Sequence, residues 1–182
     1  FDKQSNMYTQ AIARKNKLTS FLRENNYERL SKRPNVTIYT GMGSFVSPNT
    51  VKVVLSEEEI ELQGKEIFIN TGSTPIIPNI EGIQQSRNVY TSTTLLDLDI
   101  LPKHLIIIGG GYIGLEFASM YAGFGSKVTI LEAGNRFMPR NDSDIAKSIR
   151  EVMEKKGIEI RLNVRTQSIH DTHDGVTLTY SD

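Results

Sequence analysis

A short apolar run that leads directly into glycines constrains this chain more than any other feature. Residues 105–108, LIII, have the continuous apolar pattern of a strand that is buried on both faces. Three consecutive glycines follow, and Gly114 comes shortly after them. Glycine has no Cβ atom, so it permits tight turns and a close approach of the backbone to another surface. The pattern predicts a strand that turns sharply into a helix.

The glycine spacing matches a motif that binds dinucleotides. Gly109, Gly111 and Gly114 fit G-x-G-x-x-G. In this motif the first glycine makes the turn, the second leaves room for a pyrophosphate, and the third lets the helix pack on the strand. The helix N-terminus offers free N–H groups and the positive end of its dipole to the phosphates. The candidate contacts to a dinucleotide are Gly109, Gly110, Gly111, Tyr112, Ile113 and Gly114.

The residues after the glycines supply the context that this motif needs. Residues 115–124 have the apolar positions of a buried helix, and residues 127–131, KVTIL, predict the next strand because they are rich in β-branched side chains. Glu132 follows that strand, roughly 20 residues after the first glycine, where such sites carry an acid that binds the adenine ribose. The simpler alternative is that the glycines only allow tight packing and that Glu132 is a solvated strand end. This alternative does not explain why the strand, the glycines, the helix, the second strand and the acid all occur in the order that the motif requires.

Strands and helices continue to alternate in the second half of the chain. We expect a helix from about Asp142, with Asn141, Asp142 or Ser143 as its N-cap and Gly157 as its C′ residue. Its predicted buried stripe is Ile145, Ile149, Val152 and Met153. Residues 158–162 predict a third strand, and a hairpin is expected to turn at Asp174-Gly175.

This alternation predicts an α/β fold with a parallel, doubly wound sheet. We expect a Rossmann-type domain over residues 96–182, incomplete at its C-terminus. Residues 1–95 are expected to form part of a second domain together with a linker. The linker is the weakly periodic stretch 79–101, which crosses this boundary.

The first half of the chain has a different organisation. Apolar residues at helical spacing predict a helix from residue 1 to about Arg23. Period-two patterns then predict strands at 35–41, 50–55 and 59–63, which together form an antiparallel meander. Residues 67–69 predict one more apolar strand, which Pro75 and Pro78 end.

The composition excludes several classes of function. Basic and acidic residues balance at 21 each, so neither nucleic acid nor an anionic membrane is an expected partner. No apolar run is long enough to span a bilayer and no signal peptide is recognisable, which favours a cytoplasmic location. The chain has no cysteine, which rules out disulfides, thiolate metal sites and a cysteine nucleophile within it. The three histidines are too scattered to predict a metal site.

Four stretches, taken together, resemble one family of enzymes. They are GGGYIGLEF at 109–117, VTILEAG at 128–134, IFINTGSTP at 67–75 and NVTIYTGMGSF at 35–45. They resemble the flavin-dependent pyridine nucleotide–disulfide oxidoreductases, which include lipoamide dehydrogenase, glutathione reductase and mercuric reductase. A bacterial branch tied to defence against reactive chlorine species resembles the chain most. The resemblance implies an FAD domain interrupted by an NAD(P)H domain. It also implies transfer of hydride from NAD(P)H through FAD to a disulfide or another acceptor.

The resemblance implies catalytic roles for two residues after the glycines. Tyr112 matches an aromatic gate that covers the flavin until the nicotinamide displaces it. Glu116 matches an acid near the flavin that helps to orient the nicotinamide carboxamide. The alternatives are that Tyr112 only covers the start of the helix and that Glu116 pairs with a nearby lysine.

The resemblance also implies contacts to FAD in the first half of the chain. Thr71, Gly72 and Ser73 match the family's second flavin motif, although Asn70 stands where many members have alanine. Gly43 matches a turn that contacts the FAD adenine. A generic glycine at the end of a strand would give the same pattern. Thr166 falls near the region that meets the NAD adenine, but the match assigns it no role.

Several features of the family are missing from this sequence. They are the first FAD motif, the redox disulfide, a later Gly-Asp flavin motif and a dimerisation domain. The resemblance therefore implies an internal fragment, inactive by itself, of a homodimeric parent that acts on a small-molecule or disulfide substrate. Two other hypotheses remain, namely a self-contained, non-catalytic dinucleotide-binding module and an unrelated interaction protein.

The acid after the second strand also predicts which nicotinamide cofactor is preferred. Glu132 would accept hydrogen bonds from the ribose of NAD(H), whereas the 2′-phosphate of NADP(H) would bring a like charge against it. Arg136 and Arg140 follow closely and favour some tolerance of NADP(H). We expect NAD(H) to be preferred.

Overall fold

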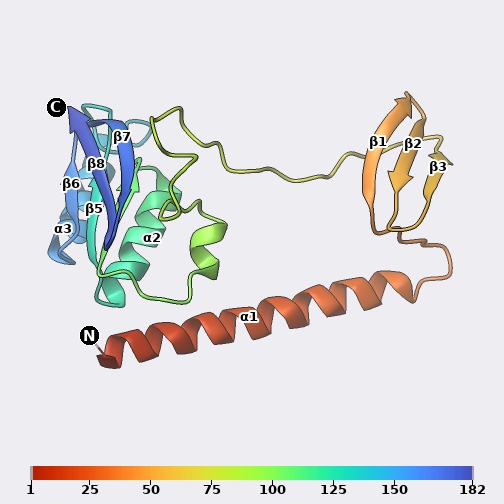
Figure 1. Ribbon diagram of the computed structural model, residues 1–182, viewed down its shortest axis with the longest axis horizontal. Helices are drawn as coiled ribbons and strands as arrows, with labels where there is room; N and C mark the ends of the chain where they lie inside the picture. Colours follow the sequence, from red (N-terminus) through yellow and green to blue (C-terminus); the bar gives the residue numbers. More distant parts are fainter. Residues whose placement is uncertain (1, 182) are drawn as a thin grey trace. The chain divides into compact units, whose positions relative to one another are not determined.

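The computed structural model describes residues 2–181, which divide into two compact units (Figure 1). The larger unit joins the chain up to Arg14 with the chain from Pro75 onwards, and the smaller unit is Lys15–Thr74. Helix α1, Asp2–Ser31, contributes residues to both. No helix among residues 2–181 is long and apolar enough to cross a membrane.

The first helix is longer than predicted. It continues beyond Arg23 to Ser31, because no helix-breaking residue occurs before Pro34. A proline disfavours helical geometry in the residue before it, so the helix ends shortly before the Arg33-Pro34 pair.

The sheet of the smaller unit is the predicted antiparallel meander, but its first strand is not the predicted one. Strands β1 (Met42–Ser47), β2 (Thr50–Val54) and β3 (Glu59–Gln63) pair in sequence order. The strand predicted at 35–41 is wrong, because that stretch forms no strand. A tight turn at residues 48–49 places Ser47 opposite Thr50, so the register of this hairpin selects residues 42–47 as the partners of β2.

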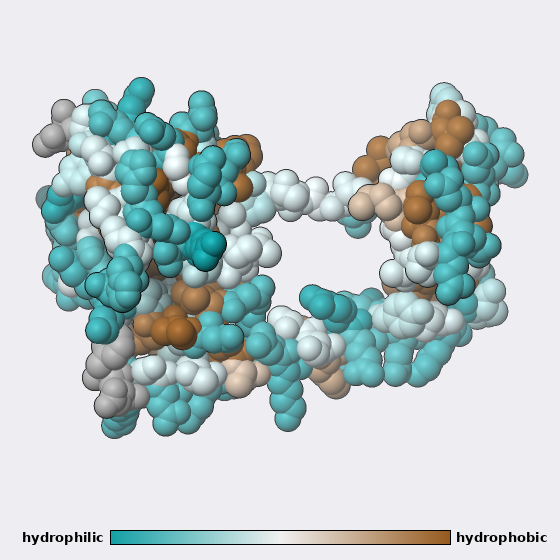
Figure 2. Space-filling view, viewed as in Figure 1, coloured by the Kyte–Doolittle hydropathy of each residue, from teal (hydrophilic) through white to brown (hydrophobic). Residues whose placement is uncertain are grey.

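The smaller unit buries little apolar surface. Among its residues, Val53 is the one hydrophobic side chain that is buried. Brown apolar patches are visible on its surface in Figure 2. The strand predicted at 67–69 is also wrong: the stretch is extended but unpaired within residues 2–181, and Phe68 is 87% exposed. Without a neighbouring strand, the backbone N–H and C=O groups of residues 67–69 have no partners with which to form a sheet. We infer that this unit contributes little stability by itself.

The larger unit contains the predicted parallel sheet. Strands β4 (His104–Ile108), β5 (Lys127–Leu131) and β6 (Glu159–Arg161) pair in parallel, in the order β4-β5-β6. Helix α2 (Tyr112–Gly123) connects the first two strands, and helix α3 (Ser143–Lys155) connects the second and third. These elements confirm the predicted strand–helix alternation.

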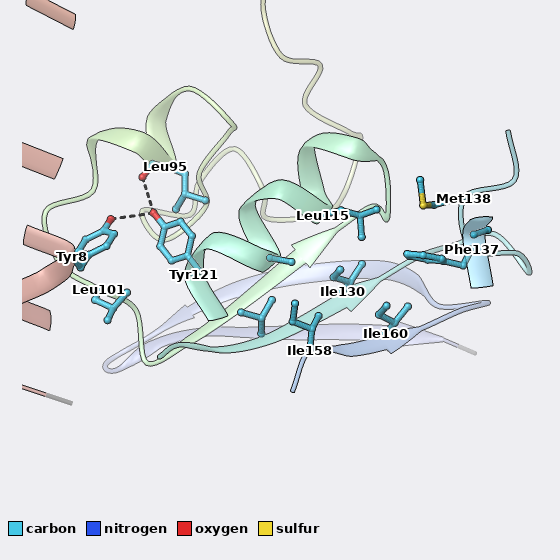
Figure 3. Close-up of a cluster of buried hydrophobic side chains, with 13 residues drawn as sticks. Tyr8, Leu95, Leu101, Leu115, Tyr121, Ile130, Phe137, Met138, Ile158 and Ile160 are labelled. Atoms are coloured by element: carbon cyan, nitrogen blue, oxygen red, sulfur yellow. Dashed lines mark hydrogen bonds between the residues drawn. The ribbon is translucent and has the colours of Figure 1, made fainter. Parts of the chain in front are cut away.

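One hydrophobic cluster holds the helices on the sheet (Figure 3). Leu115, Ala118 and Tyr121 come from α2, and Ile130 of β5 and Ile160 of β6 face them. Ala118 and Ile130 are fully buried. The close fit of α2 against β5 fixes where the turn between β4 and α2 lies, and therefore positions the candidate site.

A pair of tyrosines ties α1 to this cluster. The Tyr8 hydroxyl donates to the carbonyl oxygen of Leu98 at 2.7 Å and lies 3.0 Å from the Tyr121 hydroxyl. Tyr121 bonds the carbonyl oxygen of Leu95 at 3.1 Å. Burial raises the pKa of Tyr121, and its hydrogen bond with Tyr8 raises it further, so the Tyr121 phenol remains neutral.

The segment expected to be a linker, 79–101, is a packed part of the larger unit. Ile83, Leu95 and Leu101 are buried, and a short 3₁₀ helix, η1, covers Thr94–Asp97. Glu81 forms an isolated parallel bridge with Ser168. The weak periodicity of this segment therefore reflects irregular but packed backbone.

Helix α3 buries a different stripe from the predicted one. Ala146 is buried, and Ile149 and Met153 pack partly against the core as predicted. Ile145 and Val152 are each 50% exposed, so their assignment to the buried face is wrong. The buried stripe therefore runs along Ala146, Ile149 and Met153.

The ends of α3 and the final hairpin agree with prediction to within one residue. Asp142 is the N-cap residue, although its side chain caps no backbone N–H, and Gly157 after the helix has a φ of +79°. Strands β7 (Arg165–Thr172) and β8 (Gly175–Ser181) pair antiparallel, with Thr172 opposite Gly175. The chain turns at His173-Asp174, one residue before the predicted Asp174-Gly175, because Gly175 already pairs with Thr172 as the first residue of β8.

Candidate nucleotide-binding site

The turn between β4 and α2 requires glycine at two of its positions. Gly109 has a φ of +102°, and its N–H donates to the carbonyl oxygen of Leu131 at 2.8 Å. A Cβ atom on Gly114 would lie 2.5 Å from the carbonyl oxygen of Gly109. The first glycine therefore serves the turn, and Gly114 serves the close packing of helix on strand.

Gly111 differs from these two glycines. Its φ of −76° suits any residue, and a Cβ atom there would have no neighbour within 4 Å. Nothing in the fold of the described residues therefore requires a glycine at this position. It borders open space at the N-terminus of α2, where backbone N–H groups have no helical partner.

Glu132 lies close to the glycine turn. One carboxylate oxygen accepts the N–H of Gly110 at 2.8 Å, and the other accepts the N–H of Gly134 at the same distance. The half-buried side chain therefore links the loop after β4 to the loop after β5. Each carboxylate oxygen has a second lone pair that can accept another donor. Glu132 is thus a hydrogen-bond acceptor held in a fixed position. This counts against the alternative that it is only a solvated residue at the end of a strand.

An open pocket of about 300 Å³ lies at the carboxyl ends of β4 and β5. Ligands of open α/β sheets bind at this edge. Gly109 and Glu132 form part of its wall, together with Ile80, Ile108, Val164 and Thr166. The Oγ1 atom of Thr166 is buried without a hydrogen-bond partner among residues 2–181. A buried hydroxyl without a partner is rare, because it costs free energy.

A larger open pocket, of about 460 Å³, lies away from the glycine turn between residues 81–86 and β7. Asp171 in its wall accepts the Ser86 hydroxyl and the N–H of Arg87. These bonds, the Ser86 bond first, lower the pKa of Asp171. The polar groups in this pocket already form hydrogen bonds with each other. Its larger volume alone therefore does not make it the better candidate for a ligand-binding site.

Tyr112 and Glu116 lie one helical turn apart on α2, and residues at this spacing share a face. Tyr112 is 62% exposed, and its hydroxyl donates to Asn141 Oδ1 at 2.9 Å. Glu116 is exposed and forms no ion pair within residues 2–181, contrary to the alternative that it pairs with a lysine. Both side chains are therefore accessible beside the glycine turn.

The candidate flavin residues lie in the smaller unit. Gly43 is in β1, and Thr71, Gly72 and Ser73 are in the extended segment after β3. All four are exposed. Gly72 has a φ of +75°, which favours glycine, and a Cβ atom there would meet nothing within 4 Å. Its conformation alone therefore accounts for a glycine.

Three further residues of the site had no role assigned from the sequence, although the family resemblance placed Thr166 near the region that meets the NAD adenine. Thr166 and Ile80 enter the pocket wall from segments far from the motif, and Asn141 was named only as a possible N-cap. No local pattern could have found them, because their proximity depends on tertiary packing. Within residues 2–181, no group of His, Cys, Asp and Glu side chains is placed to hold a metal ion.

Comparison with known proteins gives a consistent match. A family model described as pyridine nucleotide-disulphide oxidoreductase matches residues 4–182. The probable pyridine nucleotide-disulfide oxidoreductase RclA of Escherichia coli K12 is 46% identical over 162 residues, which cover 89% of this chain and 37% of that protein. Dihydrolipoyl dehydrogenase of Geobacillus stearothermophilus is 40% identical over 154 residues, covering 84% of this chain and 32% of that protein.

A solved structure agrees with these matches. The HOCl-induced flavoprotein disulfide reductase RclA from Escherichia coli superposes with a TM-score of 0.90 at 44% identity. The superposition covers 94% of this chain and 39% of that one. This chain therefore spans well under half the length of the relatives it matches.

Proposed function

This chain belongs to the pyridine nucleotide–disulphide oxidoreductases, and we propose that its larger unit is the NAD(H) site of an FAD-dependent member. The parent enzyme would pass hydride from NAD(P)H through FAD to a disulfide or another acceptor. Because the chain spans only 37% of RclA and 32% of the dihydrolipoyl dehydrogenase, it holds only part of that machinery. By itself it is expected to be inactive, since it has no cysteine to accept electrons.

The observation that carries the proposal is the open space at Gly111. The fold requires Gly109 and Gly114 for its own geometry, but not Gly111. A glycine that no packing explains, at a helix N-terminus beside a fixed carboxylate, suits a pyrophosphate that approaches the backbone. The N–H groups of the first turn of α2 would donate to the phosphates.

The adjacent pocket suits the adenosine half of the dinucleotide. Glu132 would accept the ribose hydroxyls with its remaining lone pairs. Thr166 Oγ1, buried without a partner, would bond a ring nitrogen or the amino group of adenine. Ile80 and Val164 would cover the faces of the ring.

The nicotinamide half would lie near the exposed side chains of α2. Tyr112 would cover the flavin until the nicotinamide arrives, and Glu116 would orient the carboxamide. FAD, when bound, supplies the hydride acceptor. Gly43 and residues 71–73 would contact it through backbone atoms, and the positive φ of Gly72 suits such a contact.

The remaining properties of the parent follow from the same proposal. We expect a cytoplasmic homodimer that acts on a small-molecule or disulfide substrate. The alternative of a self-contained sensor or partner-binding module finds no specific support, since the matched relatives extend well beyond the region that this chain covers.

Glu132 should set the preference between the two nicotinamide cofactors. We predict that the full-length flavoprotein binds NADH more tightly than NADPH by roughly tenfold, about 1–2 kcal/mol. Glu132→Ala should bring the two affinities together, as measured by titration with each cofactor. The loss of the bonds to Gly110 and Gly134 would weaken both cofactors alike, so the ratio isolates the contact with the 2′ position. Glu116→Ala is the matched control and should leave the ratio unchanged. A wild-type preference for NADPH would contradict the assignment.

Thr166→Val should change stability and binding in opposite directions. Valine has nearly the same shape and removes a buried hydroxyl without a partner, so the free energy of unfolding should rise by about 1 kcal/mol. The affinity for NADH should fall by roughly fivefold, because the hydroxyl is lost as a partner of the adenine. Urea unfolding and NADH titration measure the two effects. Unchanged binding would place the adenine elsewhere.

A further inference from the structure

One hydrogen bond joins the first residue of α2 to the loop that precedes α3. The Tyr112 hydroxyl donates to Asn141 Oδ1 at 2.9 Å. Tyr112 directly follows Gly111 at the glycine turn, and its side chain is 62% exposed. With so little packing around the ring, this bond is the main restraint on the orientation of the phenol.

Asn141 is held firmly by the loop to which it belongs. Its N–H donates to the carbonyl oxygen of Met138 at 3.0 Å, which closes a tight turn. Phe137 and Met138 are buried, and Figure 3 shows them beside Leu115, in the N-terminal half of α2. Met138 has a φ of +48°, a conformation that its buried side chain holds in place. The acceptor for Tyr112 is therefore fixed relative to α2.

We propose that Asn141 is a positioning residue that holds Tyr112 in one rotamer at the entrance of the dinucleotide site. This inference rests on the proposed function, in which Tyr112 moves when the nicotinamide binds. If the phenol must leave its resting rotamer, the bond to Asn141 has to break first. Only molecules in which the bond is broken can then bind NADH. The observed affinity for NADH equals the intrinsic affinity multiplied by the fraction of such molecules. Asn141 thereby tunes how readily the site admits its cofactor.

The test compares four forms of the full-length flavoprotein with FAD bound: wild type, Asn141→Ala, Tyr112→Phe and the double variant. The dissociation constant for NADH is taken from the concentration dependence of flavin reduction after rapid mixing. Each single variant should lower this constant by roughly three- to fivefold, the effect of one net hydrogen bond. The double variant should lower it no further, because either change removes the same bond. The limiting rate of flavin reduction in Asn141→Ala should equal that of wild type.

Asp142→Ala is the matched control, since it changes the same loop end, where the Asp142 side chain forms no capping bond, while the acceptor of the Tyr112 hydroxyl is Asn141. It should leave the dissociation constant unchanged. Tyr112→Phe removes only the hydroxyl of an exposed ring, so folding does not limit the test. Additive effects, or unchanged NADH binding in either single variant, would overturn the proposal. If NADH fails to reduce the flavin of the wild-type protein, the proposed function itself fails, which is a different outcome.

Discussion

Replacing Gly111 with alanine is expected to weaken NADH binding by about a hundredfold and to leave the fold intact. The added methyl group would meet no protein atom within 4 Å, and the φ of −76° is ordinary for alanine. The loss of a glycine N-cap should cost less than about 1 kcal/mol. The methyl group would instead occupy the space that the motif reserves for the pyrophosphate. Titration with NADH and thermal unfolding of the full-length flavoprotein measure the two effects.

Gly123 provides a matched control for this experiment. It lies at the other end of α2, and a Cβ atom there would also have no neighbour within 4 Å. Gly123→Ala should therefore leave NADH binding at the wild-type level. If Gly111→Ala bound NADH as tightly as this control, the pyrophosphate would not lie at the glycine turn.

Gly114→Ala should mainly lower the stability of the fold, whereas Gly111→Ala should mainly weaken NADH binding. Its Cβ atom would lie 2.5 Å from the carbonyl oxygen of Gly109 and 3.2 Å from Ile107 Cγ2. Relieving such a backbone clash costs about 3 kcal/mol, while the better helix propensity of alanine returns at most about 1 kcal/mol. The free energy of unfolding should fall by about 2 kcal/mol in urea denaturation. Wild-type stability in this variant would mean that α2 and β4 are not packed as described.

The parallel sheet could be predicted from sequence because its signals are local. The run at 105–108, the glycines and the β-branched residues at 127–131 each specify their own element, and the structure contains all of them. The family resemblance is also confirmed, since the family model covers residues 4–182. The roles of the individual site residues remain predictions.

The incorrect predictions concern features that non-local pairing decides. Residues 35–41 have a strand-like pattern, but the turn at 48–49 gives β2 a different partner. Residues 67–69 are apolar enough for a strand, yet within residues 2–181 they have no strand beside them. The exposure of Ile145 depends on how α3 meets the core, which its own periodicity does not specify.

The candidate site shows the same division. The glycine turn and Glu132 belong to one local motif, so their proximity could be predicted. Thr166 reaches the pocket from β7, and Asn141, in the loop before α3, meets Tyr112 at the start of α2. Both depend on the packing of the whole unit; the family resemblance pointed only to the region of Thr166, and nothing in the sequence pointed to the contact of Asn141 with Tyr112.

A structure of the full-length flavoprotein with NADH bound tests the central claim most directly. We predict that the pyrophosphate accepts hydrogen bonds from the backbone N–H groups after Gly109 and that a ribose hydroxyl donates to Glu132. The adenine should lie in the pocket lined by Thr166. A dinucleotide bound elsewhere, for example in the larger pocket beside Asp171, would contradict the account.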